Sequence, residues 1–99
     1  MTIDELRYPL GKAEFPEKIN EKHLEQWINT IASFPSELEQ LMEGVSEQDL
    51  SLTYRPGSWT IRQVIHHLAD SHMNSYIRFK WAMTEDEPLI KAYDEQLWA

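Results

Sequence analysis

The chain has 99 residues, 41% of them apolar, and a formal net charge of −8 from 9 Lys and Arg against 17 Asp and Glu. This length predicts one small domain with a modest core, and the apolar fraction argues against an intrinsically disordered chain. The acidic balance argues against nucleic acid or an anionic membrane as a partner, and the absence of cysteine excludes disulfide scaffolds, Cys-ligated zinc and thiol nucleophiles.

Residues 1–19 are predicted to form an N-terminal arm, because Pro9, Gly11 and Pro16 interrupt any long element. The first residues are polar and lack the apolar core of a signal peptide. No stretch of the sequence approaches the roughly 18 apolar residues that a membrane-spanning helix needs. We therefore expect a soluble cytoplasmic protein that does not contact a membrane.

A kinked helix is predicted over 20–44. Asn20 is a suitable N-cap, and apolar residues recur at helical spacing on both sides of Pro35. Because the apolar stripe stays in phase across the proline, we expect one bent helix of about 21–43 rather than two helices. Gly44 is the natural residue to end it with a positive φ.

The next predicted elements are a short helical turn at 46–50 and a long helix at 60–83. The long helix begins at a capping box, in which Thr60 and Gln63 satisfy each other's backbone donors. Its apolar residues occupy more than one side, which indicates that it has more than one neighbour to pack against.

Residues 84–99 are predicted to be an acidic loop followed by the start of a further helix, for which Asp94 is a candidate cap. No strand pattern and no repeat is present. The sequence thus predicts an all-α fold of two long antiparallel helices and an N-terminal arm. Two helices alone make a poor core, so we expect either a partner chain or a missing C-terminal half.

Histidines and an aspartate cluster on the 60–83 helix, and His67 is the most informative of them. It is interpreted either as a metal ligand facing a bundle core or as a half-buried ring bonded to a neighbouring hydroxyl or carbonyl, and the pattern alone favours the second. His66 and Asp70 fit an exposed i, i+4 pair, His72 a core position and His23 the surface. A weaker hypothesis is a metal-binding module formed by His66, His67, Asp70 and His72.

Residues 57–74, GSWTIRQVIHHLADSHMN, closely resemble the first metal-ligand helix of the DinB/YfiT-like metalloprotein superfamily. The likeness continues through 75–80 and includes the segments 7–11 and 93–95, so it spans nearly the whole chain. It is closest to the YfiT branch of that superfamily. Members of the branch are described as metal-dependent hydrolases, and relatives are thiol S-transferases that use bacillithiol.

The resemblance implies half of a DinB-like four-helix bundle that binds a divalent metal, zinc or nickel, through three histidines. The position that matches the first ligand is His67, whereas His66 matches a non-ligand position. The family's other two ligands form an H-x-x-x-H pair, which these 99 residues do not contain. The implied activity is hydrolysis or thiol S-transfer on a small-molecule substrate, including a low-molecular-weight thiol.

Two hypotheses therefore remain open at the level of sequence. In the first, the chain is the N-terminal half of a metal-dependent enzyme whose metal activates water or a thiol. In the second, it is a non-catalytic chain that self-associates, as a homodimer, into a four-helix bundle.

Overall fold

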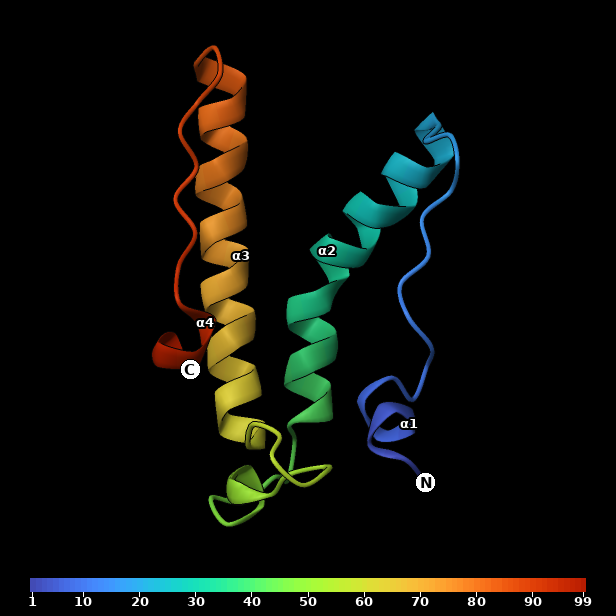
Figure 1. Cartoon of the computed structure of the whole chain (residues 1–99), viewed down its shortest axis with the longest axis vertical. Helices are drawn as coiled ribbons and strands as arrows, with labels where there is room; N and C mark the ends of the chain where they lie inside the picture. The colour runs from blue at the N-terminus through green and yellow to red at the C-terminus, as the bar shows by residue number, and fades with distance from the viewer. The chain divides into compact units, whose positions relative to one another are not determined.

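The computed structural model describes all 99 residues and contains helices but no strands, which confirms the all-α fold class (Figure 1). The chain divides into two units, Met1–Ser46 and Glu47–Ala99, where the sequence predicts one small domain. The physical reason is the lack of a core, since no side chain anywhere in the chain is buried.

The first unit begins with a short helix that the sequence analysis missed, α1 (Ile3–Arg7). A capping box forms it: the Thr2 hydroxyl accepts from the Glu5 backbone N–H at 3.1 Å, and the Glu5 carboxylate accepts from the Thr2 N–H at 2.9 Å. The predicted arm at 1–19 is therefore partly helical. The box satisfies two backbone donors that the first turn of a helix otherwise leaves without partners.

The long helix of this unit is α2 (Glu21–Leu41), which contains Pro35 as predicted and ends slightly before the predicted boundary. The Asn20 side chain accepts from the His23 N–H at 2.9 Å, and the His23 Nδ1 accepts from the Asn20 N–H at 3.1 Å. His23 is half-buried and completes this N-terminal cap, a role that the prediction of a surface residue does not include. Gly44, just beyond the helix, has the expected positive φ of 75°.

The second unit opens with a 3₁₀ turn, η1 (Asp49–Ser51), slightly later than the predicted turn at 46–50. The helix α3 (Ile61–Thr84) follows, and its predicted capping box is present. The Thr60 hydroxyl accepts from the Gln63 N–H at 3.2 Å, while the Gln63 carboxamide oxygen accepts from the Thr60 N–H at 3.0 Å. The sequence therefore locates the start of α3 correctly.

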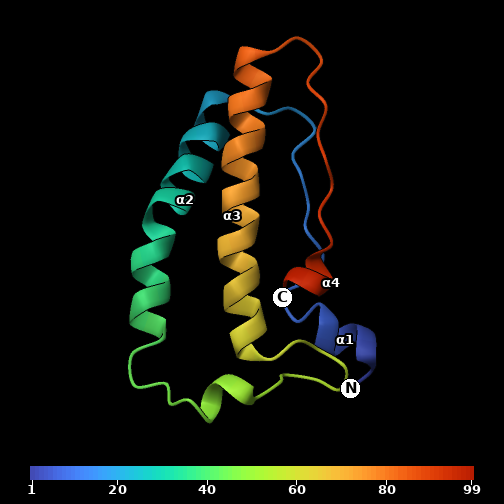
Figure 2. The ribbon, with the colours of Figure 1, turned by 90° about the vertical axis from the view of Figure 1, so that its left-hand side faces the viewer.

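After α3 the chain turns and runs back alongside the same helix to α4 (Glu95–Trp98), as Figures 1 and 2 both show. The Arg78 guanidinium donates to the Lys91 carbonyl at 3.1 Å and fixes the returning segment to α3. Asp94 caps α4 by accepting from the Leu97 N–H at 3.0 Å, which confirms its predicted role. The predicted acidic loop is thus partly ordered against α3.

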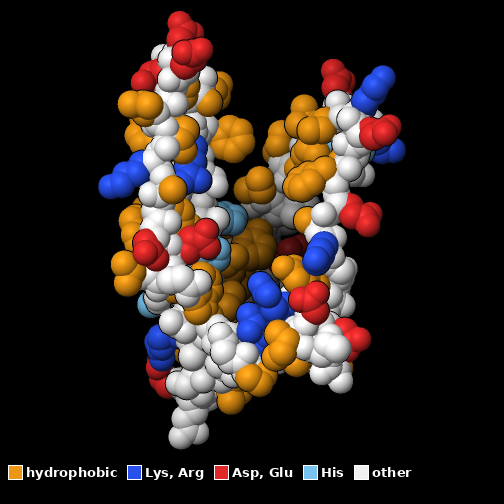
Figure 3. Space-filling view, in the orientation of Figure 1, with side chains coloured by type: hydrophobic (Ala, Val, Ile, Leu, Met, Phe, Trp, Pro, Cys, Tyr) orange, Lys and Arg blue, Asp and Glu red, His pale blue; other side chains and the backbone are white.

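Large apolar side chains lie open along both long helices (Figure 3). On α2, Ile28 and Ile31 are 64% and 58% exposed, and on α3, Tyr76 and Phe79 are 64% and 69% exposed. These positions belong to the apolar stripes that the sequence predicts as core-facing. Neither long helix combines the length and the apolar character needed to cross a membrane.

Candidate functional site

The imidazole of His67 lies on α3 in a half-buried position against an indole ring. The centroids of His67 and Trp59 are 5.0 Å apart, and the two rings are tilted by 54°. His67 Nδ1 is buried and has no hydrogen-bond partner. Since nearly all buried polar atoms are hydrogen-bonded, this atom is an exception that needs an explanation. Nδ1 therefore does not make the bond to a hydroxyl or carbonyl that the alternative interpretation of His67 predicts.

The indole that contacts His67 is itself held in place. Trp59 Nε1–H donates to the Gln96 carboxamide oxygen at 3.0 Å, a bond that joins the start of α3 to α4 across 37 residues of sequence. This bond restricts the rotation of the Trp59 ring. Because the ring centroids of Trp59 and His67 are 5.0 Å apart, it also limits the orientations open to the His67 ring. The ring of His67 thus packs against an indole that is itself bonded to Gln96 of α4.

The other predicted metal ligands do not join His67. His66 is exposed, and Asp70 is half-buried beside Asn74, whose side chain donates to the Asp70 backbone carbonyl at 2.8 Å. His72 is exposed, so its predicted core position is wrong. No three His, Asp or Glu side chains gather in an arrangement that could hold a metal ion, and the hypothesis of a metal-binding module on this helix is wrong. Rotation of about 100° per residue directs these side chains to different faces.

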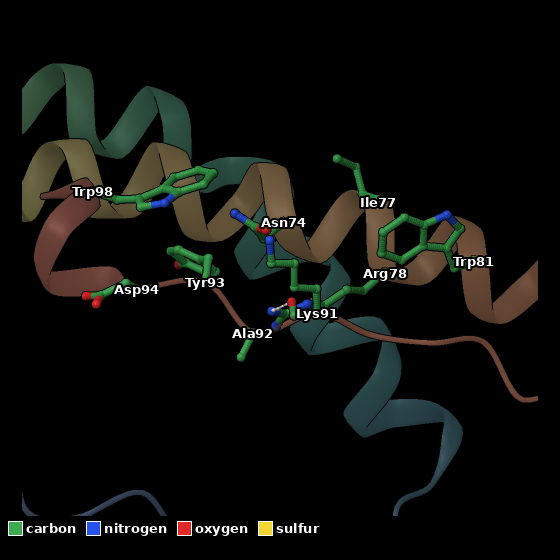
Figure 4. A pocket seen from close by; sticks show the side chains of 9 residues that line it. All are labelled: Asn74, Ile77, Arg78, Trp81, Lys91, Ala92, Tyr93, Asp94 and Trp98. Atoms are coloured by element: carbon green, nitrogen blue, oxygen red, sulfur yellow. Dashed lines mark hydrogen bonds between the residues drawn. The ribbon is translucent and has the colours of Figure 1, made fainter.

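A cavity of about 540 Å³ lies between α3 and the returning segment of the same unit (Figure 4). Its lining combines aromatic rings, two cationic side chains, one carboxylate and one carboxamide. The lining residues are Asn74, Ile77, Arg78, Trp81, Lys91, Ala92, Tyr93, Asp94 and Trp98.

The sequence does not predict this cavity, because an acidic loop followed by the start of a helix, as predicted for 84–99, does not indicate where that segment packs. The available signal was the change from the acidic run to Lys91 and Tyr93, which marks a segment that packs against the helix. The Tyr93 ring meets the Trp98 ring at 4.9 Å and the Arg78 guanidinium at 5.9 Å.

Comparison with known proteins places these features in a family. The model of the DinB superfamily matches residues 22–99. The chain is 46% identical over 99 residues to "Putative metal-dependent hydrolase YfiT" of Bacillus subtilis, covering 100% of this chain and 56% of that protein. It is also 46% identical over 97 residues to a "Putative metal-dependent hydrolase" of Bacillus cereus strain B4264, covering 98% of this chain and 56% of the relative.

A solved structure is similar as well. The structure of YfiT from Bacillus subtilis, described as "a probable metal-dependent hydrolase with an unusual four-helix bundle topology", superposes with a TM-score of 0.86 at 47% identity. The match covers 95% of this chain and 54% of that one. The chain thus spans about half the length of the curated relatives it matches, and its fold corresponds to that part of the four-helix bundle.

Proposed function

The chain belongs to the DinB superfamily, and we propose from this premise that it supplies His67 as one ligand of a divalent metal ion in a metal-dependent hydrolase. The observation that carries the proposal is the buried Nδ1 of His67, which has no hydrogen-bond partner. The same residue occupies the position that the sequence resemblance assigns to the first metal ligand. An imidazole held half-buried by a neighbouring ring suits that task.

The donor set of these residues fits one ligand of such a site. Neutral imidazole binds both zinc and nickel well, and the choice between these two metals is part of the proposal. Since no three suitable side chains gather within the chain, we assign the remaining ligands to residues outside these 99. When bound, the metal would lower the pKa of a coordinated water or substrate thiol and so supply a nucleophile near neutral pH.

The chain's own contribution is to hold the imidazole in one orientation. Trp59 packs against the His67 ring, and Gln96 accepts the Trp59 indole N–H. Ligands fixed before the metal arrives lose less conformational freedom on binding, which favours affinity. Trp59 and Gln96 are therefore positioning residues for the proposed ligand.

We extend the proposal to two reaction classes, hydrolysis by activated water and S-transfer by an activated thiol. Both would use the acidifying effect of the metal ion on a water or a thiol, and both act on a small molecule. We place the protein in the cytoplasm. The two classes differ in whether a low-molecular-weight thiol is consumed, and an assay of free thiol with the metal-loaded full-length protein would separate them.

Nuclear magnetic resonance of the histidine rings tests the metal proposal on this chain. Substoichiometric paramagnetic nickel should broaden the ring signals of His67 before those of His66 and His23, which serve as internal controls. The His67→Ala variant should bind nickel more weakly than the wild type, whereas His66→Ala should not. Equal broadening of all histidine rings, or equal affinity of the two variants, would contradict the proposal.

A second candidate function is self-association without catalysis. The observation that favours it is the absence of any buried side chain together with the open apolar stripes on α2 and α3. A homodimer would cover these stripes and assemble four long helices. Sedimentation equilibrium should then show a dimer, and circular dichroism should show a helix content that rises with protein concentration. A folded monomer at all concentrations would exclude self-association.

A further inference from the structure

We propose that the cavity between α3 and the returning segment binds an organic carboxylate with a flat apolar body. Its volume of about 540 Å³ lies within the 300–1,000 Å³ that is typical of small-molecule sites. All of its lining belongs to one unit of the chain, from Asn74 on α3 to Trp98 on α4. The class of ligand follows from the charge and from the shape of the walls.

Two cations in the lining lack an acidic partner. Neither Arg78 nor Lys91 forms an ion pair, although the chain carries 17 Asp and Glu against 9 Lys and Arg. The Asp94 carboxylate, the only acid in the lining, accepts from the Leu97 N–H as the cap of α4. The cavity is therefore a locally positive site in an acidic protein, which favours an anion.

The guanidinium of Arg78 is already oriented. One of its five N–H donors bonds the Lys91 carbonyl at 3.1 Å, and the group lies 5.9 Å from the centroid of the Tyr93 ring. The remaining donors keep the planar fork that matches a carboxylate. In Figure 4 the Lys91 side chain extends from the returning segment, and both Lys91 and Asn74 line the cavity.

The ends of the cavity are apolar and aromatic. Trp98 and Tyr93 lie at one end and Trp81 with Ile77 at the other, with the two cations between them (Figure 4). The Tyr93 and Trp98 rings are 4.9 Å apart and tilted by 55°. Aromatic faces bind flat apolar groups well, because they bury a large area with few rotatable bonds. A carboxylate joined to an aromatic ring matches both parts of the lining.

The cavity shares one face of α3 with His67. Asn74 and Arg78 follow His67 by seven and eleven residues, which returns each to within about 20° of the same direction. At a rise of 1.5 Å per residue they lie about 10 and 16 Å further along the axis. A carboxylate held at Arg78 whose apolar body lies against Tyr93 and Trp98 would extend along α3 toward the end of the helix that carries His67. The role of the bound acid as a substrate rests on the proposed function. The binding of the acid to the cavity does not.

The experiment is a fluorescence titration of the chain, in which Trp81 and Trp98 report on the cavity. The probes are 3-phenylpropionate, its neutral amide and inorganic phosphate. The carboxylate should bind at least about tenfold more tightly than the amide, because only the acid uses the two cations. Equal affinity of acid and amide, phosphate binding as tight as that of the acid, or no binding of the acid would each overturn the proposal.

Variants locate the site. Arg78→Gln and Lys91→Gln should each weaken binding of 3-phenylpropionate about tenfold. The matched control is Arg62→Gln, which removes one positive charge from the same helix at a residue that is paired with Glu47 outside the cavity. Arg62→Gln should leave the affinity for 3-phenylpropionate unchanged. Equal losses of affinity in all three variants would mean that net charge alone causes them, which would refute the site. Circular dichroism verifies that each variant keeps its helix content.

The two proposals fail separately. His67→Ala should abolish preferential nickel binding and leave binding of 3-phenylpropionate unchanged. A wild-type chain that does not bind nickel would refute the metal proposal alone. A wild-type chain that does not bind 3-phenylpropionate would refute the cavity assignment alone.

Discussion

Replacement of His67 by phenylalanine should stabilise the metal-free chain. The buried Nδ1 of His67 has no partner, and a buried polar atom left unsatisfied costs about 1–3 kcal/mol. Phenylalanine removes this atom and retains an aromatic contact with Trp59, whose ring centroid lies 5.0 Å from that of His67. The two residues also have similar helix propensities. Because the ring is only half-buried, we expect the lower end of the range, a gain of about 1 kcal/mol.

Urea unfolding followed by circular dichroism, in the presence of a chelator, measures this gain. With a slope of about 1–3 kcal/mol per molar urea, the midpoint of His67→Phe should rise by roughly 0.3–1 M. The matched control is His66→Phe, the same change at the adjacent exposed position, which should alter stability by less than about 0.5 kcal/mol. Added nickel should stabilise the wild type and not His67→Phe. A midpoint of His67→Phe below that of the wild type would refute the argument.

Three further predictions concern the caps, the proline and the α4 contact described above. Thr60→Ala removes the cap of α3 and should lower the free energy of unfolding by about 1 kcal/mol, measured by urea titration. Pro35→Ala restores an interior donor in α2 and should raise helix content and stability by about 1–3 kcal/mol, measured in the same way. Gln96→Met removes the acceptor of the Trp59 indole N–H, whose proton resonance should move upfield; an unchanged resonance would disprove the bond.

Local patterns in the sequence predict α2, α3 and α4. The start of α3 was predictable because the Thr60 and Gln63 capping box is a short-range interaction between residues three apart. The same logic applies to Asp94 and α4. The helix α1 differs from the predicted arm because Thr2 and Glu5 form a capping box before the breaks at Pro9 and Gly11.

The burial of side chains was less predictable, because it depends on neighbours that no local pattern specifies. His72 was assigned to a core from its place in an apolar stripe, yet it is exposed. The same stripe contains Tyr76 and Phe79, both more than half exposed. Helical spacing shows which residues share a face, and only a packing partner determines whether that face is buried.

The site depends on contacts that sequence spacing cannot show. His67 was identified through a family resemblance, but its contact with Trp59 and the bond from Trp59 to Gln96 arise because the chain returns along α3. The cavity has the same origin, since Lys91 and Tyr93 reach Arg78 only after the turn at the end of the helix.

The four residues of α4 form too short a helix to be stable alone, since an isolated helix needs a dozen or so residues in water. Their order must therefore come from contacts with the rest of the unit: the cap by Asp94, the Trp98 ring against Tyr93, and the bond from Trp59 to Gln96. Gln96 and Trp98 lie two residues apart in the single turn of α4. Gln96 bonds the Trp59 indole that packs on His67, and Trp98 lines the cavity. Order in α4 is consequently a shared requirement of the proposed metal ligand and of the proposed carboxylate site, even though the two bind chemically different species.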